Sequence, residues 1–244
     1  MIKIMLYRLA LILCAIAINC QILPAQTPSS QDLIKEGNAR YEHADYEAAI
    51  TEYRKITPTA GAAYAQALYN IGVCYYELNR TDAAIAMYRA SIAARPDYAQ
   101  AFYALGVALE DTGTRLEAKA AYQRALAVSR GQLPAAAHKL GVLLASAGDY
   151  DAAAKLFKQA IEQSHDKLPA SHNNLGVMLA QNGRLAEAAR QFEIALAQTE
   201  GSFADASHNL KLCRLLLNTR TSDSLAAMRL VTDESAQQIK RGKD

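Results

Sequence analysis

Three residue types of a hydrolytic triad stand side by side at Ser164-His165-Asp166. In a triad, the nucleophile, the base and the carboxylate converge in space, so the three side chains must point at one another. Adjacent residues of a chain point their side chains apart, and we therefore interpret this tripeptide as a loop between two helices. The chain also has no glycine-rich phosphate loop and no paired-cysteine motif. The sequence predicts no catalytic residue, no cofactor site and no enzyme activity.

Metal binding is the other chemistry that the residue types suggest. His138, His172 and His208 recur 34 and 36 residues apart. A zinc site needs about four ligands at ~2 Å, usually supplied by residues that are close in sequence. Neighbouring helices would bring two of these histidines together, but not three. We therefore predict no metal site.

Cysteine use predicts thiols and not disulfides. Two of the four cysteines lie within the first 25 residues, and the other two are Cys74 and Cys213. These two occupy the same place in repeated units that lie four units apart. Stacked helix layers are roughly 10 Å thick, so the separation exceeds the Cα distance of a disulfide. We predict two buried free thiols.

The elements that must position any site are repeated along the chain. A glycine recurs with spacings of 35, 34, 35 and 35 residues, an alanine follows it by twelve residues, and an aromatic residue follows it by sixteen. The glycines are Gly37, Gly72, Gly106, Gly141 and Gly176, and the aromatic residues are Tyr53, Tyr88, Tyr122, Phe157 and Phe192. The alanine and the aromatic residue share one face of a second helix. We expect the glycine where two helices approach closely and the aromatic side chain in the groove between neighbouring pairs. A period of this length indicates a solenoid.

At these places the sequence resembles the tetratricopeptide repeat, a helix–turn–helix unit of 34 residues. The resemblance covers about 30–218 and implies an all-α, right-handed superhelical solenoid. It implies five units at about 30–63, 65–98, 99–132, 134–167 and 169–202, a capping helix over 203–218, and a tail over 219–244 that is partly helical or disordered. No unit carries the tryptophan of the family.

Residues 1–25 differ from the repeats. Lys3 and Arg8 precede an apolar run over 9–18, and Ala25 offers a small residue for cleavage. This order is typical of a secretory signal peptide. The run is too short for a membrane-spanning helix, which needs roughly 20 residues. We expect an exported protein, periplasmic or secreted and bacterial, with a buried first helix or an uncleaved anchor as the alternative.

The charge balance excludes two classes of partner. Removal of residues 1–25 takes away Lys3 and Arg8, which leaves 24 basic against 24 acidic residues. A neutral chain argues against nucleic acid, which calls for a basic stripe, and against electrostatic binding to membranes. We predict no stable membrane insertion after signal cleavage. A cell-envelope assembly lipoprotein anchored at Cys20 remains an alternative, although Ala17 and Asn19 fit lipid attachment poorly.

The resemblance also implies a binding surface. In this family the concave wall is formed by the first helices, mainly by residues three before, two before and one after the glycine. Here these rows carry valines, flanked by tyrosines in the first half and by histidine, asparagine and lysine in the second. The predicted partner-binding groove consists of Tyr69, Asn70, Val73, Tyr103, Val107, His138, Lys139, Val142, Asn173, Asn174, Val177 and His208. Tyrosines and valines supply buried area and amides read backbone groups, so the groove suits an extended peptide.

The predicted function is a non-enzymatic scaffold that binds a peptide segment of a partner protein in this groove, outside the cytoplasm. In the alternative, the valines only pack between helices and the polar row is solvated. The chain would then be a structural or self-assembling module that uses the ends of its solenoid. A chaperone C-terminal carboxylate, a known ligand of the family, is excluded because Ile34, Gln100 and Ala104 replace its cations.

The closing helix is apolar around more than one face, through Leu210, Leu212, Cys213, Leu215, Leu216 and Leu217. A helix with apolar residues on more than one face is usually buried on two sides. Either Leu225, Met228 and Val231 fold back over it from a short helix that Ser222 would cap, or another chain covers it. We expect the tail to fold back, with self-association through the C-terminal end as the alternative.

Overall fold

The computed structural model describes residues 28–219 and 228–231. Within these ranges the chain is all helical and has no strand. The elements are α2 (Ser30–Glu42), α3 (Tyr46–Tyr53), the 3-10 turn η1 (Pro58–Ala60), α4 (Ala62–Glu77), α5 (Thr81–Ala94), α6 (Ala99–Asp111), α7 (Arg115–Val128), α8 (Pro134–Ser146), α9 (Tyr150–Gln163), α10 (Pro169–Gln181), α11 (Leu185–Gln198) and α12 (Ala204–Thr219). The predicted signal peptide over 1–25, including Cys20, lies outside the described residues.

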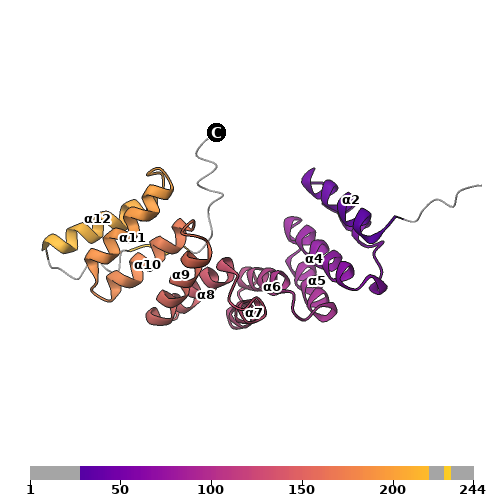
Figure 1. The fold of residues 1–244 in the computed structure, drawn as a ribbon, viewed down its shortest axis with the longest axis horizontal. Coiled ribbons are helices and arrows are strands. Elements are labelled where there is room, and N and C mark those ends of the chain that lie inside the picture. Colours follow the sequence, from indigo (N-terminus) through magenta and orange to yellow (C-terminus); the bar gives the residue numbers. More distant parts are fainter. Residues whose placement is uncertain (1–27, 220–227, 232–244) are drawn as a thin grey trace, which may run out of the picture.

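Five antiparallel helix pairs, from α2/α3 to α10/α11, stack in chain order, and α12 packs on α10 and α11. The stack forms an open arc with α2 at one end, α12 at the other and α6 and α7 in the middle (Figure 1). Each pair packs on the next pair along the chain. The predicted all-α solenoid of helix–turn–helix units is confirmed. No helix in the described ranges combines the length and the apolar character needed to cross a membrane.

Local signals in the sequence set the helix ends. Ser29 caps α2 in a capping box with Asp32, and Asp149 caps α9 through the Ala152 amide at 3.2 Å. Pro134 and Pro169 stand at the first position of α8 and α10, where the missing N–H is harmless. Between the two helices of a pair, the chain turns through a residue with positive φ. Three units use glycine there, with φ of +79°, +83° and +74° at Gly113, Gly148 and Gly183.

The marker glycine of every unit lies against the aromatic ring of the same unit. A Cβ placed on Gly106 would come within 2.4 Å of the Tyr122 ring, and one on Gly141 within 2.8 Å of the Phe157 ring. The same contact recurs in the other three units. The aromatic side chain therefore joins the two helices of its own pair. It also shares a core cluster with residues of the next pair, as Tyr88 does with Leu105. A methyl group has no room at these sites.

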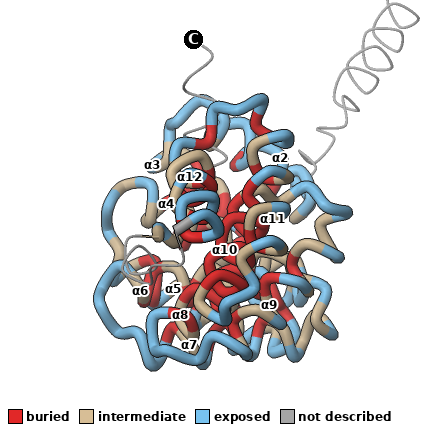
Figure 2. The backbone as a smooth tube through the Cα atoms, turned by 90° about the vertical axis from the view of Figure 1, so that its left-hand side faces the viewer, coloured by how far each residue is buried: buried red, intermediate tan, exposed pale blue. Residues whose placement is uncertain are grey.

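Among the described residues the core falls in successive clusters along the stack, and Figure 2 shows the buried stretches of the tube in its interior. Small alanines let the helices approach, and the aromatic residues at the glycines are buried. Cys74 and Cys213 are both buried free thiols, as the sequence predicted. Burial raises the pKa of the Cys74 thiol to about 11, which keeps it protonated at neutral pH.

The glycine contact yields a test of the fold. Gly106→Ala forces a methyl group into the Tyr122 ring and should destabilise the protein by about 1–3 kcal/mol, which thermal unfolding followed by circular dichroism would measure. Gln123→Ala, at an exposed site on the neighbouring helix, serves as the control and should change stability by less than about 0.5 kcal/mol. Equal unfolding midpoints for the two variants would contradict the close approach.

Candidate functional site

The Ser164-His165-Asp166 tripeptide does not converge. It closes the turn after α9, where His165 and Asp166 have φ of +54° and +64°. The Ser164 hydroxyl donates to the Ile161 carbonyl at 2.9 Å, while the Asp166 carboxylate lies 2.8 Å from Nε2 of His172. The serine and the aspartate therefore face different partners, and the tripeptide has the geometry of a turn.

The three histidines at repeat spacing have separate surroundings. Nδ1 of His138 lies 2.7 Å from the Ser171 hydroxyl, and the ring of His172 lies between Asp166 and Gln191, at 2.8 Å from each. His172 is buried, and His208 on α12 is half-buried. In residues 28–219 and 228–231, no group of three His, Cys, Asp or Glu side chains is placed to hold a metal ion.

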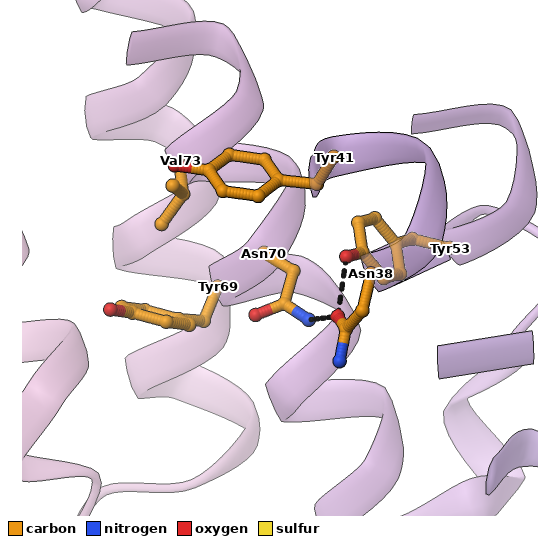
Figure 3. Close-up of a pocket in the computed structure, with 6 residues that line it drawn as sticks. All are labelled: Asn38, Tyr41, Tyr53, Tyr69, Asn70 and Val73. Atoms are coloured by element: carbon orange, nitrogen blue, oxygen red, sulfur yellow. Dashed lines mark hydrogen bonds between the residues drawn. The ribbon is translucent and has the colours of Figure 1, made fainter. Parts of the chain in front are cut away.

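The N-terminal half of the predicted groove is a hollow of about 200 Å³ between α2 and α4 (Figure 3). Three predicted residues, Tyr69, Asn70 and Val73, line it together with Asn38, Tyr41 and Tyr53, which the prediction did not include. The Asn70 amide donates to Oδ1 of Asn38 at 3.3 Å, and the Tyr53 hydroxyl donates to the same oxygen at 2.7 Å. The hollow thus combines aromatic walls with amide groups, which is the composition of a small polar and apolar binding pocket.

The groove tyrosines are held by the repeat frame. The Tyr69 ring lies 5.9 Å from the ring of Tyr88 and 5.3 Å from that of Tyr98, and the Tyr103 ring lies 5.9 Å from that of Tyr122. Burial raises the pKa of the Tyr69 hydroxyl, so this side chain stays neutral. Both groove rings are half-buried and pack on the rings that contact the marker glycines. They are therefore positioned before any ligand arrives.

In the middle of the arc the groove residues differ in exposure. Val107 is half-buried, whereas Val142 is buried in the C-terminal core together with Val177. Lys139 is nearly buried, and its ammonium group lies 3.7 Å from the Glu110 carboxylate on the preceding unit. The valine strip is thus accessible at Val73 and Val107 and forms part of the packed core further along.

The C-terminal half of the groove holds a segment of the chain itself. Asn174 is fully buried and brackets Val231: it donates to the Val231 carbonyl at 2.8 Å and accepts from the Val231 amide at 2.8 Å. Asn209 brackets Arg229 in the same way, with both hydrogen bonds at 2.8 Å. Asn173 donates to the Arg229 carbonyl at 3.1 Å and accepts from Asn209 at 2.9 Å. Three amides from α10 and α12 therefore bind the backbone of 228–231.

The side chains of this segment add apolar and charged contacts. Val231 is 5% exposed and packs in a pocket formed by Ala170, Ala195, Phe203 and Ala206. Met228 and Leu230 pack against the C-terminal core. The Arg229 guanidinium lies 3.5 Å from the Asp205 carboxylate at the exposed side of α12.

Residues 228–231 lie in no helix, so the predicted short helix through Met228 and Val231 is wrong at these positions. Asn209 binds the backbone of Arg229, and Asn174 binds that of Val231, two residues later. In an extended chain, every second residue faces the same side, so this spacing indicates an extended segment. The segment reaches the groove side of α12, while Leu215 and Leu217, 47% and 45% exposed, lie elsewhere on that helix. The predicted groove included Asn173 and Asn174 but omitted Asn209, and the tail was expected over the closing helix and not in the groove. Asn209 stands in the row of Asn174, 35 residues later, so the repeat register contained the signal.

Comparison with known families agrees with this architecture. A tetratricopeptide repeat model matches residues 103–167 and 138–203, and a second TPR repeat model matches residues 72–113. Together the two models span 72–203, more than half of the 244 residues. The chain therefore contains tetratricopeptide repeats within residues 72–203. A search of curated proteins found no match.

Several solved structures have a similar fold, and one of them is described as a TPR protein. A crystal structure of MamA is 25% identical, with 67% of this chain and 94% of that chain covered and a TM-score of 0.58. YrrB, described as a TPR protein with an unusual peptide-binding site, is 23% identical, with 75% and 92% covered and a TM-score of 0.59. MamA from Desulfovibrio magneticus is 15% identical, with 74% and 100% covered and a TM-score of 0.57. These likenesses show the fold, a solenoid of helical repeats.

The amide contacts yield a prediction about proteolysis. Asn209→Ala removes both hydrogen bonds to Arg229 and should increase the population of the released segment by about tenfold, at about 0.5–1.5 kcal/mol for each bond. Trypsin should then cleave after Arg229 correspondingly faster, because cleavage follows the open population. Mass spectrometry of the fragments measures the rate, with cleavage after the exposed Arg130 as the internal reference. Equal rates after Arg229 in both proteins would show that these bonds do not hold the segment.

Proposed function

We propose that the protein is a non-enzymatic scaffold that binds an extended segment of a partner protein along its concave groove. One observation carries the proposal: buried amides of α10 and α12 bind both backbone groups of alternate residues in an extended segment. Such contacts read a peptide backbone and do not depend on its sequence. The inner wall of this solenoid therefore has the chemistry that a peptide ligand requires.

The N-terminal hollow supports the same proposal independently of the tail. Its rings are packed in place and half-exposed, and aromatic anchors of this kind carry much of the energy of protein interfaces. Asn70 stands two residues before its glycine, the place that Asn174 occupies in the fifth unit. The fold is shared with YrrB, whose description includes a peptide-binding site, although the likeness at 23% identity concerns the fold.

A selected peptide provides the test. Peptides isolated from a random library on the intact protein should bind Tyr69→Ala more weakly by about 1–2 kcal/mol, measured by isothermal titration calorimetry. Gln123→Ala and Arg89→Ala change the second helices, away from the groove, and should leave affinity unchanged. Thermal unfolding of each variant separates lost binding from lost fold, since Tyr69 also packs on Tyr88. If peptide affinity is unchanged by Tyr69→Ala and Asn70→Ala but falls with Arg89→Ala, the site lies on the convex face.

We also propose that the scaffold works outside the cytoplasm, on the basis of the charged start, the apolar run and the small residue within 1–25. Mass spectrometry of the protein purified from its native cells should give a mature N-terminus near Gln26. A retained Met1 would contradict export by cleavage, and a lipid mass on Cys20 would favour the envelope lipoprotein.

Self-association is a second candidate, favoured by the exposure of Leu217 and Leu215 on the last helix of the arc. Apolar side chains at the end of a solenoid can stack on another copy. Light scattering at tens of micromolar tests this candidate, which predicts a mass greater than that of one chain.

A further inference from the structure

We propose that residues 228–231 are a resident ligand of the groove, and that a partner segment of the same chemistry must displace them to bind. This inference rests on the proposed peptide-binding function and adds to it the ligand pattern and the competitor. The site takes an extended segment with an apolar residue, a basic residue, an apolar residue and then valine. The partner is a protein that carries such a segment.

Each position of the pattern follows from a contact. The last position must be a small aliphatic residue, because Val231 is buried among Ala170, Ala195, Phe203 and Ala206. The second position favours a cation, because the Arg229 guanidinium faces the Asp205 carboxylate. The first and third positions contact the C-terminal core through Met228 and Leu230. These side-chain contacts supply a sequence preference that the amides alone do not give.

The backbone contacts explain why the site would suit a ligand from another chain. Asn174 and Asn209 each satisfy one N–H and one C=O of the segment, and any extended residue other than proline presents both groups. Without an occupant these buried amides need water in place of the backbone, so an occupied groove is favoured. The site therefore binds backbone whether the segment comes from this chain or from a partner.

Tethering favours the resident segment. Residues 220–227 connect α12 to Met228, and a short connection of this kind gives an effective concentration in the millimolar range. A partner segment with equal contacts at micromolar concentration would be excluded. Weak ligands therefore cannot displace the resident segment. A ligand displaces it only if it binds the groove more tightly or also occupies the N-terminal hollow.

Two full-length variants release the segment without changing the groove. Val231→Asp places a charge in an apolar pocket, and Arg229→Pro removes the N–H that Asn209 accepts. Both residues lie outside the helices, so the repeats should unfold at nearly the wild-type temperature. The probe is a fluorescent synthetic peptide with the sequence of residues 225–234, and its anisotropy reports binding.

The peptide should bind both released variants at least tenfold more tightly than it binds the wild-type protein. A matched peptide carrying Val231→Asp should not bind, and one carrying Arg229→Glu should bind more weakly. Adding Asn174→Ala to the Val231→Asp protein should abolish the gain in affinity, whereas adding Gln123→Ala should leave it intact. Light scattering should show one chain throughout.

Three results would overturn the inference. Equal affinity of the peptide for wild-type and released proteins would show that the segment does not occupy the groove in solution. No binding to either released variant would show that the segment is not a ligand of this site. A wild-type dimer that dissociates in the Val231→Asp variant would show that the segment is exchanged between copies. None of these results bears on library peptides that depend on Tyr69, so the proposed function is tested separately.

Discussion

The contact between a glycine of the first helix and an aromatic ring of the second is the constraint on which this structure depends. In each of the five pairs, a Cβ at the glycine would lie 2.3–2.8 Å from the ring. No side chain fits at that distance, so the glycine fixes how closely the two helices approach. The same contact repeats every 34 or 35 residues, and the helix pairs therefore stack as equivalent layers.

The rings that contact the glycines also pack against side chains of the groove. Tyr69, Tyr103 and His138 stand three residues before successive glycines, and each packs on the ring that its own glycine contacts. Residues on the concave wall are thereby held in place by the core of their pair. Preorganised side chains lose less entropy on binding, which favours ligand affinity. A substitution at one of these glycines would therefore shift the groove side chains as well as destabilise the fold.

The repeat register of the sequence predicted the fold and the groove residues that line the site, but it did not predict the segment that occupies the site. The period located the glycines and the wall that carries Tyr69 and Asn174. It could not locate the occupant of the groove, because the contact between Val231 and Asn174 joins residues 57 apart with no repeat relation between them. Local spacing of Leu225, Met228 and Val231 favoured a helix, and tertiary hydrogen bonds to three amides decided for an extended segment instead.

The magnitudes explain why the resident segment is suited to exchange. Five hydrogen bonds join the three asparagines to Arg229 and Val231, each contributing about 0.5–1.5 kcal/mol net. Ordering four residues opposes them at about 1–2 kcal/mol each, so backbone binding and chain entropy nearly cancel. The burial of Val231, about 1.5–3 kcal/mol for a side chain of this size, then decides whether the groove is filled. A site whose balance depends on the burial of Val231 and on the partly buried Met228 and Leu230 can hold its own tail and still release it to a segment with a few more contacts.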